Sequence, residues 1–280
     1  MAEGRCARPL DGMSPQRILL LAPHPDDEVV GCAVAARRAI AGGAAIFALY
    51  LTTGVPPRAA LWPWQRARYD ARVARRRVEA ESAAVLLGIT PVGFLDWPSR
   101  TLKAQLAAAL AAIRDAIAKY AIEMLWAPAW EGAHQDHDVA NFLAAQLALQ
   151  CPAMEFAEYH FHGGRVQSGS FFDADGSEET IALTPDEAAW KRRLLALYGS
   201  ERGNLAHITC AHEALRPLPA HDYARRPHRG PLFYERFQWV PFRHPRVDFE
   251  RPDAVLAALA GFARPTRVED AAVAPPARVP

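Results

Sequence analysis

Apolar runs alternate with helix-forming stretches along the first 160 residues of the chain. The apolar runs lie at 17–22, 45–51, 91–95, 122–127 and 154–160, and each has the length of a buried strand. The stretches between them have helical periodicity or are rich in Ala, the residue with the highest helix propensity. This alternation predicts right-handed crossovers and a mostly parallel sheet. We therefore expect a single α/β domain, Rossmann-like, with helices on both faces of the sheet.

Two helices have recognisable start signals. The strand at 17–22 ends at Pro23, and residues 28–40 after it are predicted to form one helix. Thr184-Pro185-Asp186-Glu187 has the form of a capping box with Pro at the first helical position, which predicts a helix over 184–200.

Prolines and tryptophans interrupt the segment that follows the second predicted strand. They are Pro56, Pro57, Trp62, Pro63 and Trp64. One interpretation is a loop over the mouth of a site, and the other is a surface loop packed around its tryptophans.

The predicted domain spans residues 17–250, between two unlike ends. Residues 1–16 have no long apolar core, so we expect a flexible segment and no signal peptide. Residues 265–280 are rich in Ala, Pro and Arg, which predicts a disordered tail. No run approaches the roughly 20 apolar residues of a membrane helix. We expect a cytoplasmic protein that does not bind membranes.

Composition agrees with a globular enzyme. The chain has 280 residues, of which 51% are hydrophobic, enough for the core of one α/β domain. Its formal net charge of +1 gives no reason to expect nucleic acid as a partner. The four cysteines contain no Cys-x-x-Cys pair, which argues against a disulfide framework and a thiolate zinc site.

Two short clusters carry the candidate chemistry. Pro23-His24-Pro25-Asp26-Asp27-Glu28 follows the first predicted strand, at the carboxyl end where α/β sheets bind ligands. On a turn, adjacent carboxylates can diverge, so that one binds a metal ion while the other faces a water molecule. In the second cluster, His134-Gln135-Asp136-His137, the two histidines would share one face of a helix that begins near Gly132.

Together the clusters indicate a hydrolytic zinc site with two imidazoles and one carboxylate. Each cluster also has a simpler explanation. The paired aspartates could cap a helix N-terminus, and a His-x-x-His pair is often only surface polarity. Asp136 could orient an imidazole or cap the helix that carries His137.

The two clusters resemble those of the PIG-L/LmbE-like family, zinc-dependent deacetylases of N-acetylglucosaminyl and related amides. The resemblance runs from about Arg17 to Asn141 and more weakly to about Val240. It implies that His24, Asp27 and His137 hold Zn²⁺, with another divalent ion such as Fe²⁺ left open.

The same resemblance implies catalytic and substrate-binding roles. Asp26 would be the general base, and His134 would stabilise the oxyanion or assist the leaving amine. Arg76 would bind substrate, although Arg72, Arg75 and Arg77 compete for that role and a solvated basic helix face is an alternative.

Three positions depart from the family pattern. Ser99 stands where many members carry a sugar-binding Asp, and Asp96 lies three residues earlier. Gly132 stands where some members have Tyr. We expect Ser99 and Asp96 to contact the substrate, and these departures leave the identity of that substrate open.

His160 and His162 lie on the last predicted strand and would face the same side. They could line the mouth of the same pocket, or each could have a structural role.

The sequence therefore predicts a zinc-dependent enzyme that removes acetyl from an N-acetylated amino sugar or its conjugate. The alternative is an amidase of the same family for another acyl amide, in thiol or natural-product metabolism. A Rossmann-like nucleotide-binding protein is disfavoured, because His24-Pro25-Asp26-Asp27 stands where a Gly-x-Gly-x-x-Gly turn would be needed. The expected partner is a small molecule, and the oligomeric state is left open.

Overall fold

The predicted strands form a seven-stranded sheet in the computed structural model, which describes residues 16–263. The strand order is β3-β2-β1-β4-β5-β9-β8, and β6 pairs with β7 in a separate hairpin. The strands are β1 (Arg17–Ala22), β2 (Ala45–Tyr50), β3 (Thr90–Phe94), β4 (Met124–Pro128), β5 (Ala153–Phe156), β6 (Tyr159–His162), β7 (Arg165–Ser168), β8 (Glu179–Ala182) and β9 (His212–Pro217). The first five are parallel, and β9 is antiparallel to both β5 and β8.

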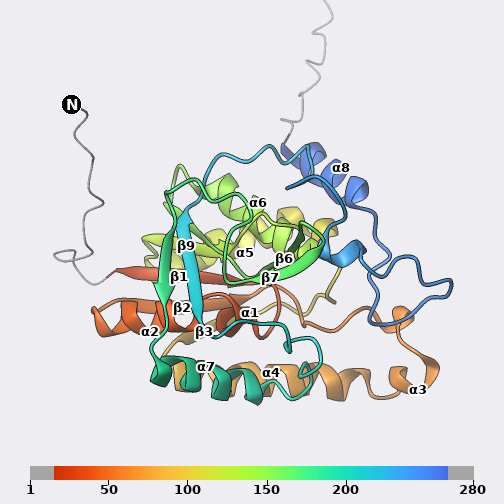
Figure 1. Ribbon diagram of the computed structural model, residues 1–280, viewed down its shortest axis with the longest axis horizontal. Coiled ribbons are helices and arrows are strands. Elements are labelled where there is room, and N and C mark those ends of the chain that lie inside the picture. Colours follow the sequence, from red (N-terminus) through yellow and green to blue (C-terminus); the bar gives the residue numbers. More distant parts are fainter. Residues whose placement is uncertain (1–15, 264–280) are drawn as a thin grey trace, which may run out of the picture.

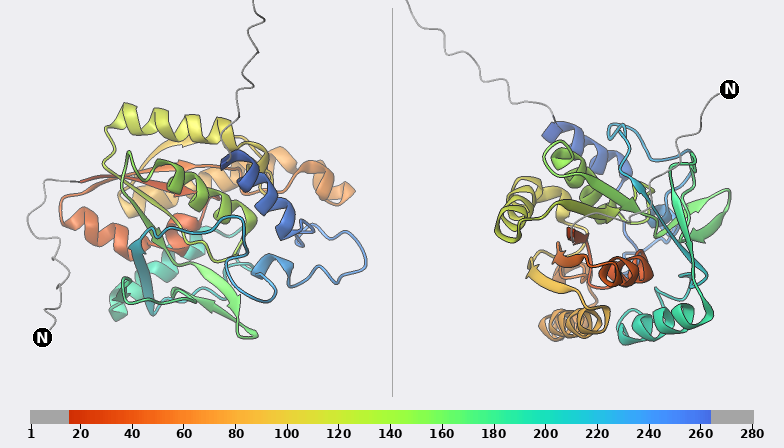
Figure 2. Two further views of the ribbon diagram at one scale, coloured as in Figure 1. Left: turned by 90° about the horizontal axis from the view of Figure 1, so that it is seen from above. Right: turned by 90° about the vertical axis from the view of Figure 1, so that its left-hand side faces the viewer.

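Helices cover both faces of this sheet (Figure 1). The α-helices are α1 (Asp27–Val30), α2 (Ala33–Ala41), α3 (Pro63–Arg66), α4 (Tyr69–Leu87), α5 (Leu106–Tyr120), α6 (Gln135–Leu147), α7 (Pro185–Leu197) and α8 (Pro252–Ala263). Short 3-10 helices are η1 (Arg58–Ala60), η2 (Leu102–Ala104) and η3 (Phe233–Glu235). The views in Figure 2 place α4 and α7 on one side of the sheet and α5, α6 and α8 on the other.

The alternation of side chains along β1 divides the core between these two layers. Leu19 and Leu21 are buried against α5, α6 and α8, whereas Ile18 and Leu20 are buried against α2, α4 and α7. A strand that is apolar on both faces must be covered on both faces. The expected α/β fold, with a mostly parallel sheet in one domain, is thus confirmed.

The helix predicted over 28–40 is divided in two at Gly31 and Cys32. A side chain at Gly31 could not fit, because an added Cβ would lie 2.1 Å from Cδ2 of Phe156. The Glu213 carboxylate then accepts hydrogen bonds from the N–H groups of Val34 and Ala35. This carboxylate from β9 caps a new helix start, which local periodicity could not reveal.

The strand predicted over 154–160 is also two strands, β5 and β6, in different sheets. Between them the buried Glu131 carboxylate accepts hydrogen bonds from the N–H groups of Glu158 and Tyr159. Backbone N–H groups that donate to a side chain no longer need a partner on the neighbouring strand. The break therefore comes from a distant glutamate.

Other sequence signals agree more closely with the structure. Thr184 caps α7 through the predicted capping box. Beyond the domain boundary predicted at residue 250, α8 packs Val255 and Leu259 into the same core as α6. The predicted tail and, apart from Gln16, the predicted N-terminal segment lie outside the described residues. No helix in the described part of the chain is both long and apolar enough to cross a membrane.

We predict that Lys191→Met destabilises the fold strongly. Lys191 Nζ lies 2.8 Å from Glu213 Oε1, and both side chains are buried. Removing the ammonium leaves a buried carboxylate without its cation, which should lower the free energy of unfolding by about 3–5 kcal/mol. Urea denaturation measures this loss. The exposed Lys119→Met variant is the control, and equal stability of the two variants would contradict the prediction.

Candidate functional site

The turn after β1 directs two adjacent aspartates to different neighbours. Asp26 has a backbone φ of 136°, a conformation that is strained for a residue with a side chain. Asp27 begins α1, and its carboxylate faces His24 and His137. The Asp26 carboxylate instead faces Arg76. The backbone conformation thus separates the two carboxylates.

The second cluster lies at the start of α6. His134 is the N-cap residue, and its Nδ1 accepts a hydrogen bond from the N–H of Asp136. The expected shared helix face is therefore wrong: His134 lies outside the helix, in extended backbone, and only His137 is in its first turn. The two rings still lie 5.5 Å apart between centroids, because the cap turns His134 toward the same space.

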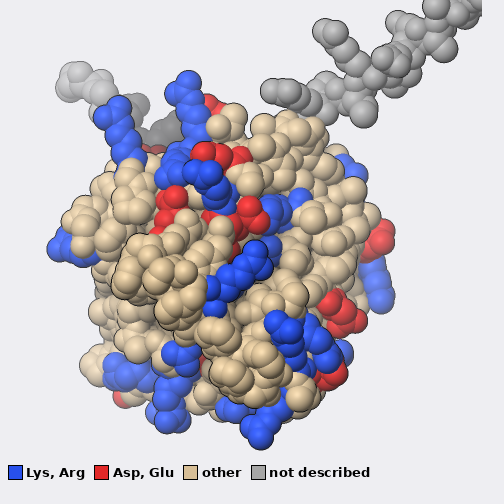
Figure 3. Space-filling model, turned by 90° about the vertical axis from the view of Figure 1, so that its right-hand side faces the viewer, with Lys and Arg blue, Asp and Glu red and all other residues tan. Residues whose placement is uncertain are grey.

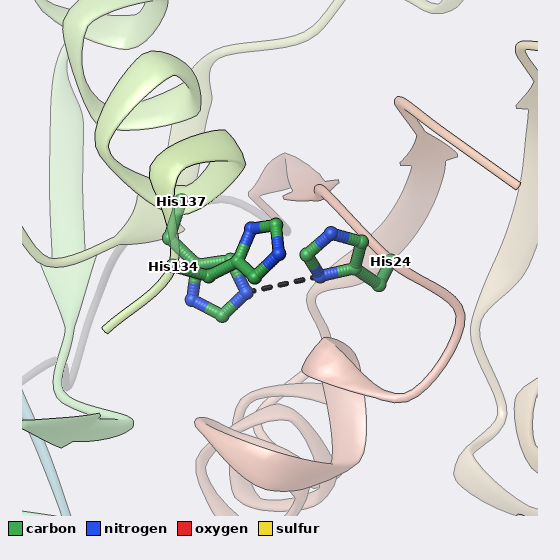
Figure 4. A group of neighbouring side chains, drawn as sticks. All are labelled: His24, His134 and His137. Carbon is green, nitrogen blue, oxygen red and sulfur yellow. Dashed lines mark hydrogen bonds between the residues drawn. The ribbon is translucent and has the colours of Figure 1, made fainter. Parts of the chain in front are cut away.

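His24, His134 and His137 converge from these two turns (Figure 4). Nδ1 of His24 lies 3.1 Å from Nε2 of His137, the pair joined by the dashed line. Asp27 completes a triangle, with oxygens 3.3 Å from the His24 atom and 3.4 Å from the His137 atom. Zinc bonds of about 2.0–2.1 Å in tetrahedral geometry separate ligand atoms by roughly 3.3–3.4 Å. The donors present therefore fit a divalent cation in type and in spacing.

Two further sets of donor atoms converge in the same place. His24, His134 and His137 form one, and Asp27, His137 and Glu158 form the other, each with its atoms within 4.8 Å of one another. His137 belongs to both sets, so this imidazole is common to every arrangement of ligands that the described residues offer.

A carboxylate lies behind each of two imidazoles. Asp136 Oδ2 is 3.1 Å from Nε2 of His24, and the Asp136 carboxylate also accepts hydrogen bonds from the N–H groups of Arg100 and Leu102. Glu158 Oε2 is 2.8 Å from Nδ1 of His137, although the two groups are not aligned for a hydrogen bond. Carboxylates in this position orient imidazole ligands and raise their basicity.

Glu158 was not predicted from the sequence. It follows β5 and is fully buried. An acidic residue directly after an apolar strand is the feature of the sequence that could have indicated its place in the site. The Asp136 side chain is also fully buried, but its N–H, not its carboxylate, takes part in the cap of α6.

Burial and these carboxylates set the charge of each group. Burial would lower the pKa of His24, but Asp27 and Asp136 outweigh it and raise the pKa to about 9. The pKa of His137 is likewise raised by Asp27 and Glu158 against the effect of burial. Both imidazoles thus sit in a strongly negative environment, which favours bound protons or a cation.

His134 behaves in the opposite way. Burial and the neighbouring His24 hold its pKa well below the usual range, so the ring is neutral. Because its Nδ1 accepts a backbone N–H, the remaining proton must lie on Nε2. His134 is therefore a hydrogen-bond donor at the wall of the cavity.

Arg76 forms the floor of the site next to Asp26. Its two terminal nitrogens each lie 3.2 Å from an oxygen of the Asp26 carboxylate, and one of them is 3.5 Å from Glu201. The guanidinium is buried, so the solvated-face interpretation is wrong. Burial raises the pKa of Asp26 to about 7, although the Arg76 charge opposes this shift.

The two other residues predicted to contact substrate lie in different places. Ser99 is buried at the cavity wall, with Oγ 3.3 Å from Nε2 of His24. Asp96 is exposed and is not among the residues that line the cavity. The loop after β3 therefore turns Asp96 to solvent, and the structure does not bring it to the site.

These groups lie at the bottom of a cavity of about 800 Å³. Pro56, Leu61 and Gln65 line it, so the Pro/Trp segment does border the site, although it contains η1 and α3 and is not a simple loop. Residues 233–248 supply much of the remaining wall.

The packing around His160, His162 and Gly132 answers two questions that the sequence left open. His160 and His162 do not line the cavity, and His160 is buried with Nδ1 3.1 Å from Glu131. Gly132 has φ of 68°, and a Cβ there would lie 2.7 Å from Cδ2 of Leu232. A tyrosine at that position could not be accommodated without moving Leu232.

Comparison with known proteins shows what part of the chain is similar to. Residues 19–148 match the family model described as PIG-L: GlcNAc-PI de-N-acetylase. Among curated proteins, none matches the chain.

Solved structures with a similar fold include a deacetylase–teicoplanin complex from teicoplanin biosynthesis, with 17% identity, a TM-score of 0.57, and coverage of 72% of this chain and 98% of that chain. They also include the A40926 pseudoaglycone deacetylase Dbv21, with 18% identity and a TM-score of 0.56. That match covers 74% of this chain and 100% of the deacetylase. At such identities the similarity shows the fold.

Proposed function

We propose that this chain is a hydrolase that removes the acetyl group from the nitrogen of an acetylated amino-sugar conjugate, because its residues 19–148 match the PIG-L family model. The observation that carries this proposal is the triangle of His24, Asp27 and His137 donor atoms, at 3.1–3.4 Å, beside the Asp26 carboxylate in one cavity. Hydrolysis of an amide is aided by an electrophilic centre and a base in the same site.

In this proposal His24, Asp27 and His137 hold a divalent cation, with zinc as the ion that suits two imidazoles and one carboxylate. When bound, zinc would polarise the amide carbonyl and make water more acidic. Asp136 and Glu158 keep the two imidazoles in the orientation that binding requires.

Asp26 is the general base of the proposed reaction. It takes a proton from the attacking water and returns it to the nitrogen of the departing amine. The Arg76 guanidinium contacts both oxygens of the carboxylate and so fixes its position. We therefore assign Arg76 to the orientation of the base, in place of the direct substrate contact expected from the family pattern.

His134 is the proposed donor to the developing oxyanion. A neutral imidazole with its proton on Nε2 can donate one hydrogen bond into the cavity, and such donors stabilise the charge that forms as water adds to the carbonyl. Burial and His24 lower the pKa of His134, so the neutral ring carries no extra proton to give up, which favours Asp26 as the acid for the leaving amine.

Acetate release tests the proposed function. The zinc-loaded protein should release acetate and free amine in equal amounts from glycosides of N-acetylglucosamine. Failure to release acetate from any such glycoside, with metal bound, would contradict the proposal.

We predict that His137→Ala abolishes tight binding of zinc. This imidazole belongs to every set of donor atoms that converges here, so its loss leaves no complete set. Metal analysis after dialysis measures the effect, with His207→Ala, at the cavity wall but outside these sets, as the matched control. Full occupancy in His137→Ala would refute the ligand assignment.

We predict that Asp26→Asn retains zinc but loses about 100-fold or more in turnover, since an amide cannot act as a base. Turnover and metal content should be measured on the same preparation. If the variant instead loses zinc and recovers activity when zinc is supplied, the roles of Asp26 and Asp27 must be exchanged.

We predict that Glu158→Gln weakens zinc binding by about 10- to 100-fold, because the imidazole of His137 loses the carboxylate behind it. Competition against a chelator of known affinity gives the dissociation constant. The exposed Glu123→Gln variant should bind zinc as the parent does, and an unchanged constant for Glu158→Gln would show that this carboxylate does not support the ligand.

A further inference from the structure

One buried acid in the turn after β1 has no role in the proposed reaction. Glu28 directly follows Asp27 and is 1% exposed. The charged side chains that Figure 3 shows lie at the surface of the molecule, whereas a glutamate is almost never fully buried without partners. Within residues 16–263, the Glu28 carboxylate has two hydrogen-bond donors, the N–H of Asp26 and the hydroxyl of Tyr198. These two partners indicate what the buried acid does.

The first contact holds the backbone of the candidate base. Glu28 Oε2 lies 3.1 Å from the backbone nitrogen of Asp26 and accepts its hydrogen bond. The strained φ of 136° at Asp26 persists only where the surrounding structure fixes it, and a buried N–H requires a partner. Glu28 supplies that partner, so its carboxylate stabilises the conformation that turns the Asp26 side chain away from that of Asp27.

The second contact fixes the carboxylate itself. Tyr198 lies at the C-terminal end of α7, is fully buried, and donates its hydroxyl hydrogen to Glu28 Oε1. With that oxygen occupied, the other oxygen faces the N–H of Asp26. The helix α7 is in turn tied to α1, because Lys191 Nζ donates a hydrogen bond to the C=O of Val30 at 2.9 Å. The position of Tyr198 relative to the turn is therefore set by the packing of two helices.

The segment at the end of α7 also reaches the other end of Asp26. The Arg76 guanidinium, which contacts the Asp26 carboxylate at 3.2 Å, lies 5.9 Å from the centre of the Tyr198 ring. Glu201, three residues after Tyr198, is 3.5 Å from the same guanidinium. Residues 198–201 thus lie next to both groups that hold Asp26, one at its backbone and one at its carboxylate.

We propose that Glu28 and Tyr198 are positioning residues for the general base. Tyr198 holds the Glu28 carboxylate, which in turn holds the backbone of Asp26. This inference rests on the proposed deacetylase function and adds two residues to its machinery. Neither side chain is among those that line the cavity, so neither contacts the substrate. Because a base acts in the transition state, a misplaced base lowers turnover and leaves substrate binding unchanged.

The Tyr198→Phe variant removes the hydroxyl and keeps the ring. In the zinc-loaded protein, kcat for acetate release from the methyl glycoside of N-acetylglucosamine should fall about tenfold, the order expected for one lost hydrogen bond to a charged group. KM and zinc content should not change. Tyr223→Phe is the matched control, because it removes a hydroxyl that donates to Asn141 Oδ1 at 2.6 Å, away from the residues that line the cavity. It should lose stability and keep its kcat.

Two substitutions of Glu28 separate its hydrogen bonds from its bulk. Glu28→Met keeps a side chain of similar length without an acceptor, and it should reduce kcat about 100-fold, the loss typical of a misplaced catalytic group. Glu28→Gln keeps an oxygen for the N–H of Asp26 and an amide that can donate to the Tyr198 oxygen, so it should recover about tenfold of that loss. Because Tyr198 acts through Glu28, adding Tyr198→Phe to Glu28→Met should cause no further loss.

A crystal structure tests the positioning independently of activity. In zinc-loaded Glu28→Met, Asp26 should leave its strained conformation and its carboxylate should shift, while zinc stays bound. An unchanged Asp26 would overturn the proposal, as would equal losses of kcat in Tyr198→Phe and Tyr223→Phe, or multiplied losses in the double variant. Loss of zinc would overturn it too, because Glu28 would then support Asp27. A parent protein that releases no acetate would refute the proposed function, and the crystal structure would still decide whether Glu28 positions Asp26.

Discussion

The strained backbone at Asp26 is the constraint on which the site depends. With φ of 136°, consecutive aspartates point to different neighbours, Asp26 to Arg76 and Asp27 to His24 and His137. A regular helix or strand could not place both carboxylates in one cavity in this way. Such strain costs about 1–3 kcal/mol, and the buried contacts of both side chains offset it. One turn thus provides a candidate ligand and a candidate base side by side.

The electrostatics of the site follow from where the acids are buried. Asp27, Asp136 and Glu158 surround the imidazoles of His24 and His137, and all five side chains are buried, so the Coulomb interactions between them are strong. The excess of negative charge favours a cation between them. Arg76 supplies the compensating charge on the other side, at Asp26. Within residues 16–263, no carboxylate is hydrogen-bonded to Nε2 of His134, and the ring remains neutral, which suits a hydrogen-bond donor.

The sequence predicted those parts of the structure that depend on neighbouring residues in the chain. Apolar runs gave the parallel strands, and both the tetrad at residues 24–27 and the His134–His137 pair lie at strand and helix ends as expected. Contacts between distant segments could not be foreseen: Glu213 divides the first helix, Glu131 divides the strand predicted over 154–160, and Glu158 lies behind His137. Residues 233–248 reach the cavity through tertiary packing, so the sequence could not assign roles to individual side chains there.

The location of the bound cation tests the central claim most directly. Diffraction from zinc-loaded crystals, recorded on both sides of the zinc absorption edge, gives the position of the ion and its ligands independently of activity. We predict one zinc ion coordinated by His24 Nδ1, His137 Nε2 and the Asp27 carboxylate, with Asp26 outside its ligands. An ion held by Asp27, His137 and Glu158, or by the three histidines without Asp27, would contradict the account.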